Sequence, residues 1–176
     1  ILADYDSRDS SSYPWPRPSY LKGLGEEAVV QPQFVWFDLP YFNNLSDDVK
    51  QGFTEIREML GSQIDVISDT TNFQTVIAAH RIIHEYEIFS NLKWAFEKHA
   101  DALSPPIIDA LKRASGITEQ DYELAIQLRS DTKNFFDSLF NDYDAILTPS
   151  ALEEAPNLSQ ATTGNPICCS IWTLCG

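Results

Sequence analysis

A short apolar run near the end of the chain constrains the fold more than any other segment. Ala145–Leu147 reads Ala-Ile-Leu and lies between Asp144 and Thr148-Pro149. The run is too short for a helix, and proline does not continue a central strand. We therefore expect a strand that is buried on both faces, as in a parallel sheet, and that ends at the proline.

Three further motifs follow this run in order. They are Ala155-Pro156, then Thr-Gly-Asn-Pro at 163–166, then Ile-Trp-Thr-Leu-Cys-Gly at 171–176. The first two are turn signals. Taken together, the four motifs resemble the C-terminal half of amidase signature enzymes, where a D-x-(I/L)-L-T-P strand precedes an A-P turn, a T-G-(N/D)-P turn and a W-T-L-x-G segment.

The resemblance implies hydrolysis of a carbon–nitrogen amide bond through a serine acyl-enzyme, without a cofactor. In that family a lysine, a serine in a cis peptide and a nucleophilic serine lie on a Gly/Ser-rich segment upstream of the region matched here. The serine cluster Ser10–Ser12 has no neighbouring glycine to form the tight turns that such a nucleophile needs. We therefore expect no catalytic residue in this chain, and no activity from it alone.

The same resemblance predicts the domain organisation. Residues 1–176 would be the later, C-terminal portion of a single amidase domain, a fragment that lacks the nucleophile. Within it, residues 1–32 are rich in Pro, Ser and Asp, and we expect them to form a surface connection.

The family likeness places substrate contacts near the last two motifs. We expect Thr163, Gly164, Cys169 and Trp172 to bind the substrate, although Trp172 could equally be a core residue. Cys168-Cys169 stands where relatives have Phe-Asn, and Glu153 replaces a glycine that is common in relatives. A relative's substrate preference therefore does not transfer to this chain.

Local patterns predict a βαβ unit in the first half of the chain. Phe34–Phe37 is β-prone and is followed by Pro40, a helix is expected from Ser46 to Gly61, and Ile64–Ile67 reads as a second strand. Such a unit favours a parallel or mixed sheet. The predicted fold is α/β, a partial amidase signature fold with a mixed sheet flanked by helices.

Three more helices are expected before the strand at 145–147. An apolar stripe runs from Val76 to Leu103, a short helix follows Ser104-Pro105-Pro106, and Thr118 opens the last helix in a capping box. We expect this last helix to bury Tyr122, Ala125, Leu128, Thr132, Phe135 and Leu139.

Charge narrows the possible partners. The net charge is -14 and the sequence pI is about 4.4, which disfavours binding to nucleic acid and to anionic membranes. No apolar run approaches the roughly 18–20 residues of a membrane span, and the first residues do not read as a signal peptide. We expect a cytoplasmic protein that binds a small-molecule amide and that could form a homo-oligomer.

Other chemical candidates are weaker. His80 and His84 lie four residues apart, but Arg81 stands where a zinc protease has Glu, and no third ligand is suggested. We expect no metal site. Cys168, Cys169 and Cys175 do not form a CxxC pattern, so we expect core or pocket-lining roles for them.

Two alternatives to a general amidase remain open. The chain could be a free-standing, non-catalytic binding module on the same scaffold. It could also belong to the glutamine-hydrolysing component of a glutamine-dependent tRNA amidotransferase, although Trp172-Thr173-Leu174 fits general amidases better.

Overall fold

The computed structural model describes residues 5–9, 12–14, 30–160 and 162–176. Two compact units divide the chain, Ile1–Gln31 and Pro32–Gly176. In the first unit the Asp6 carboxylate accepts hydrogen bonds from the backbone and the guanidinium of Arg8. Most of the predicted surface connection 1–32 lies outside the described residues.

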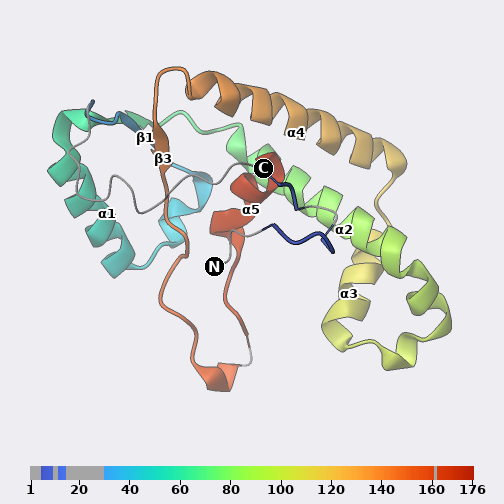
Figure 1. Ribbon diagram of the computed structural model, residues 1–176. Helices are drawn as coiled ribbons and strands as arrows, with labels where there is room; N and C mark the ends of the chain where they lie inside the picture. Colours follow the sequence, from blue (N-terminus) through green and yellow to red (C-terminus); the bar gives the residue numbers. More distant parts are fainter. Residues whose placement is uncertain (1–4, 10–11, 15–29, 161) are drawn as a thin grey trace. The chain divides into compact units, whose positions relative to one another are not determined.

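A three-stranded parallel sheet organises the second unit (Figure 1). The strands are β1 (Phe34–Phe37), β2 (Ile64–Ile67) and β3 (Ala145–Leu147), in the order β2-β1-β3. Phe34 lies opposite Ile64 on one side and Ala145 on the other. The α/β class is confirmed. The described strands pair only in parallel, because each connection between them is a helical crossover.

The β1–β2 crossover contains α1 (Asp47–Leu60), preceded by the 3-10 helix η1 (Pro40–Asn44) and followed by η2 (Gly61–Gln63). As predicted, the Ser46 hydroxyl caps α1 by accepting from the backbone N–H of Val49 at 3.4 Å. Gly61 ends the helix with φ 52°, a conformation that favours glycine.

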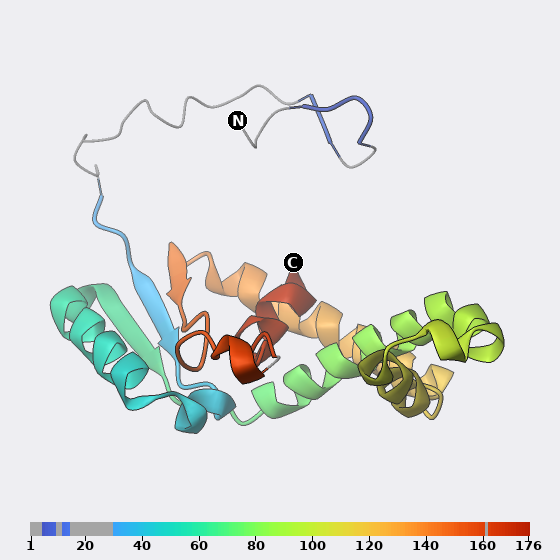
Figure 2. The ribbon, with the colours of Figure 1, turned by 90° about the horizontal axis from the view of Figure 1, so that it is seen from below.

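The second crossover is a helical layer made of α2 (Phe73–Lys98), α3 (Pro105–Ala114) and α4 (Glu119–Leu139), with η3 (Ala100–Ala102) between the first two. α2 and α4 run side by side, and α3 packs against α2 away from the sheet (Figures 1 and 2). The predicted capping box of α4 is present, since Thr118 and Asp121 each accept the other's backbone N–H.

The last segment forms η4 (Leu158–Gln160) and α5 (Ile167–Cys175). Sequence patterns predicted no helix here. Cys168, Ile171 and Leu174 are buried on α5, which packs on α2 and α4.

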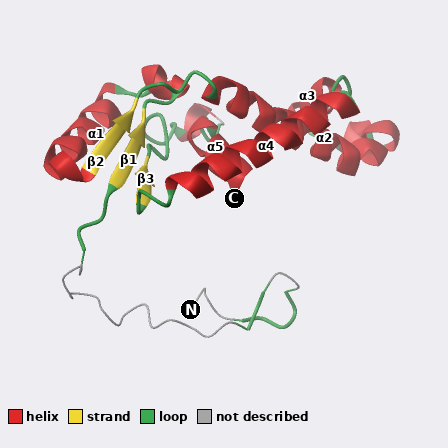
Figure 3. Cartoon of the chain, turned by 90° about the horizontal axis from the view of Figure 1, so that it is seen from above, coloured by secondary structure: helices red, strands yellow, loops and turns green. Residues whose placement is uncertain are grey.

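The two faces of β1 contact different layers. Val35 and Phe37 point into the main core, where the Phe37 ring lies 5.5 Å from that of Phe73 and 6.0 Å from that of Phe136. Trp36 points to the opposite face and lies 4.9 Å from Phe53 of α1. Figure 3 shows α1 on one side of the strands and α4 and α5 on the other.

Two burial predictions were wrong. Ala145–Leu147 is half-buried rather than buried on both faces, because β3 is an edge strand. On α4, Phe135 is 45% exposed and Phe136 is 5% exposed. The buried line of this helix runs through Ala125, Thr132 and Phe136, which shifts the predicted stripe by one residue.

Among the described residues, no helix is long and apolar enough to cross a membrane.

Candidate functional site

The carboxyl ends of β1 and β3 lie at the same edge of the sheet, because the strands are parallel. η1 follows β1 and the loop 148–156 follows β3, and the two are joined by a hydrogen bond from the Ser46 N–H to the Leu152 carbonyl at 2.8 Å. The chain leaves β1 toward β2 on one side, whereas β3 pairs on the other side. Ligands of α/β proteins bind at such a divergence point.

The loop after β3 encloses a hollow of about 410 Å³. Thr163 and Gly164, two of the predicted substrate-binding residues, line it opposite the segment 150–156. Gly164 has φ 91°, which a residue with a side chain rarely adopts. Its N–H donates to the Thr162 hydroxyl at 3.2 Å, and the Asn165 side-chain oxygen accepts from the Ile167 N–H at 3.0 Å. These bonds fix the turn at the start of α5.

The charge of this hollow selects among ligands. Glu153 and Glu154 line it, and no Lys, Arg or His is among its described lining residues. Two carboxylates disfavour an anionic ligand by like-charge repulsion. The hollow therefore suits a neutral or cationic group.

Cys169, a third predicted site residue, lies elsewhere. It is exposed on α5, and its thiol makes a weak hydrogen bond to the Ser150 carbonyl at 3.8 Å. It lines a broad groove of about 1020 Å³ between α2 and α5, together with His80, His84 and Thr173. Asn165 and Pro166 line both the groove and the loop hollow.

Trp172, the fourth predicted residue, lines neither cavity. Its ring packs 5.3 Å from that of Phe136 at the border of the core. The indole Nε1 is buried and has no hydrogen-bond partner among the described residues. The four predicted residues thus do not share one cavity, and their contact with substrate stays a prediction.

Two residues at the sheet edge were not predicted from the sequence. Tyr41 in η1 is among the largest fully buried side chains, and the Thr148 hydroxyl is its polar neighbour. Both hydroxyls are buried without a hydrogen bond of good geometry among the described residues. Burial raises the pKa of Tyr41 to about 12, an effect that Thr148 partly opposes. Tyr41 follows the Asp38-Leu39-Pro40 turn, the one local signal that places it at a strand end.

The cysteines and histidines show no activated group. Burial, followed by the neighbouring Cys169, raises the pKa of the Cys168 thiol. Burial, followed by His84, lowers the pKa of His80. The two imidazole rings stack with centroids 6.0 Å apart. No group of three or more metal-ligating side chains occurs within the described ranges.

The serine hydroxyls that donate hydrogen bonds serve structural roles. Ser68 donates to the Asp38 carboxylate, Ser115 to the Lys112 carbonyl and Ser138 to the Asn134 carbonyl. None of these three acceptors is a general base that could activate a serine for attack.

No family model matches the chain. The A-type subunit of glutamyl-tRNA(Gln) amidotransferase from Pseudomonas entomophila (strain L48) is 28% identical over 196 residues, covering 94% of this chain and 39% of the relative. The protein of the same description from Synechococcus sp. (strain RCC307) is 26% identical over 184 residues, covering 86% of this chain and 36% of the relative.

A solved structure described as "Crystal structure of amidase" has the same fold, with a TM-score of 0.69 at 21% identity over 84% of this chain and 37% of that chain. The chain therefore spans less than two fifths of the length of these relatives. These likenesses, at low identity, support the resemblance to amidase signature enzymes.

Proposed function

We propose that these residues form the later portion of an amidase-type hydrolase that cleaves a carbon–nitrogen amide bond. The amidase fold match over 84% of the chain carries this proposal. The ordered motifs from Ala145 to Trp172 and the amidotransferase relatives support it.

In the proposed reaction a serine oxygen attacks the amide carbon, and its proton passes through the bridging serine to a neutral lysine. Backbone N–H groups stabilise the tetrahedral oxyanion. Collapse of this intermediate breaks the carbon–nitrogen bond, and the amine leaves with the proton. Water then hydrolyses the acyl-enzyme to a carboxylic acid. We place the attacking serine outside residues 1–176.

The contribution of this chain would be to position the substrate. The hollow lined by Thr163 and Gly164 lies at the sheet edge where α/β proteins bind ligands. Because its lining carries Glu153 and Glu154, it fits the neutral amide better than the carboxylate product. We infer that this difference favours release of the acid.

A serine-reactive fluorophosphonate probe tests the placement of the nucleophile. We expect it to label the product of the complete reading frame at a serine outside residues 1–176, and to leave the isolated 176-residue chain unlabelled. Excess amide substrate should compete with labelling, whereas heat-denatured protein serves as the background control. Specific labelling of the isolated chain would overturn the placement.

The amidotransferase relatives favour a second candidate, the glutamine-hydrolysing component of a tRNA amidotransferase. The complete protein would then release ammonia from glutamine and would need partner proteins to act on glutamyl-tRNA(Gln). Comparing hydrolysis of glutamine with that of short unsubstituted amides by the complete protein separates the two, because a general amidase does not depend on the amino-acid part of glutamine.

The broad groove between α2 and α5 favours the remaining alternative, a non-catalytic binding module. In that case the product of the complete reading frame would show neither probe labelling nor amide hydrolysis.

A further inference from the structure

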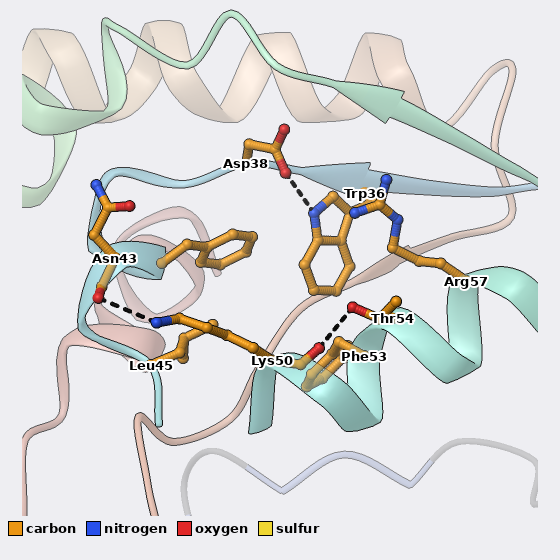
Figure 4. Close-up of a pocket in the computed structure, with 9 residues that line it drawn as sticks. Trp36, Asp38, Asn43, Leu45, Lys50, Phe53, Thr54 and Arg57 are labelled. Atoms are coloured by element: carbon orange, nitrogen blue, oxygen red, sulfur yellow. Dashed lines mark hydrogen bonds between the residues drawn. The ribbon is translucent and has the colours of Figure 1, made fainter. Parts of the chain in front are cut away.

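A small aromatic hollow lies between α1 and β1, on the opposite face of β1 from the main core (Figure 4). Its volume is about 230 Å³, and its aromatic side chains are Trp36, Phe42 and Phe53. The Trp36 ring lies 4.9 Å from each phenylalanine ring, at a tilt of 50°. A dry protein cavity of about 150 Å³ accommodates benzene, so this hollow has room for one aromatic ring.

Two cations border the aromatic rings. The Arg57 guanidinium carbon lies 5.5 Å from the Trp36 ring centroid, and Arg57 has no carboxylate partner among the described residues. The Lys50 ammonium has only long contacts, 3.5 Å to the Asn43 carbonyl and 3.9 Å to the Asp47 carboxylate. Both cations therefore retain donors for a further acceptor.

The acid in this hollow is already engaged. Asp38 accepts from the Trp36 indole N–H at one oxygen and from the Ser68 hydroxyl at the other, each at 2.8 Å. These bonds hold the carboxylate beside the indole. With two cations and one acid, the described lining carries one net positive charge, whereas the chain as a whole carries -14.

We propose that this hollow binds a single-ring aromatic carboxylate. The ring would contact Trp36, Phe42 and Phe53, because aromatic rings prefer tilted and offset contacts such as these side chains provide. The carboxylate would face the Arg57 guanidinium, whose planar donors match two carboxylate oxygens, with Lys50 as a second cation. This site follows from the described residues alone and does not depend on the proposed hydrolysis.

The test uses benzoate as the probe and benzamide as its neutral counterpart. Saturation-transfer NMR and calorimetry on the product of the complete reading frame should show saturable benzoate binding at about 1 mM or tighter. Benzamide should bind about tenfold more weakly or not detectably, because it lacks the charge that Arg57 recognises. Binding should also weaken as salt is raised.

Arg57→Gln should weaken benzoate binding by about tenfold or more. The matched control Arg129→Gln removes an exposed guanidinium from α4 and should leave binding unchanged. Lys50→Gln provides a second variant, expected to weaken binding by a smaller factor, and thermal melts establish that each variant is folded. Absence of saturable benzoate binding, equal binding of benzamide, or equal affinities for Arg57→Gln and Arg129→Gln would each overturn the proposal.

Discussion

The hydroxyls of Tyr41 and Thr148 lie beside each other at the carboxyl ends of β1 and β3, and neither makes a hydrogen bond of good geometry within the described residues. A buried hydroxyl without a partner loses its hydrogen bonds to water on folding, which costs about 1–3 kcal/mol. This pair is therefore a locally unfavourable feature at the edge where we place the substrate.

Tyr41→Phe should keep the folding stability at neutral pH or raise it by about 1 kcal/mol, because it removes an unpaired hydroxyl and keeps the ring. Urea unfolding measures this change. A loss of more than about 1 kcal/mol would show that the Tyr41 hydroxyl has a partner in solution.

The same substitution has a pH signature. The pKa of Tyr41 is raised from 10.0 to about 12, so the folded protein keeps its proton in a range where the unfolded chain releases it. The unfolding free energy should therefore be unaffected by this group below pH 10 and should fall by about 2–3 kcal/mol between pH 10 and 12. Urea midpoints across this range, wild type minus Tyr41→Phe, isolate the effect. A difference that does not change with pH would contradict the burial of this phenol.

The capping box at the start of α4 gives a second stability prediction. Thr118→Ala removes the hydroxyl that accepts the Asp121 N–H at 3.1 Å, and it should destabilise the fold by about 1 kcal/mol. Ser130→Ala, at an exposed position inside the same helix, should change stability by less than about 0.5 kcal/mol. Thermal unfolding of both variants checks this, and equal melting temperatures would argue against the cap.

Glu85 should be more important for stability than the other acids of α2. One of its carboxylate oxygens accepts from Arg81 and from Arg113 of α3, each at 3.1 Å, and its side chain is only 11% exposed. Glu85→Ala should cost about 2 kcal/mol, since it unties α3 from α2 and leaves two guanidiniums unpaired. Glu97→Ala, in the exposed pair with Lys93, should cost less than about 0.5 kcal/mol. Similar denaturation midpoints for the two variants would refute this difference.

The isolated 176-residue chain should self-associate. Large apolar side chains are exposed on its helices, including Trp94 at 59% and Leu124 at 64%, and β3 has an unpaired edge in the described sheet. Light scattering coupled to gel filtration should detect oligomers whose share grows with concentration. A monomeric sample that melts cooperatively would count against the proposal that these residues are part of a larger domain.

Local sequence signals predicted the secondary structure where the signal is itself local. The strands at 34–37, 64–67 and 145–147 and the caps at Ser46 and Thr118 follow from β-propensity and side-chain hydrogen bonding within a few residues. α5 was missed because its sequence is apolar on nearly every side, so it has no amphipathic stripe to reveal a helical period.

The candidate site depended on pairings that no local pattern encodes. The Tyr41 and Thr148 hydroxyls meet only because β3 pairs with β1 rather than with β2. Likewise, Thr163 and Cys169 look like neighbours in sequence, yet they line different cavities, because α5 begins between them.

The position of β1 between its two partners has a consequence for synthesis in the cell. Phe34, Val35 and Trp36 emerge early from the ribosome, but their second set of backbone partners, Ala145–Leu147, emerges after all of α1 to α4. Throughout that interval one flank of the nascent strand is open. A chaperone that binds extended apolar peptides would find its target there, and translation past Leu147 would end the exposure.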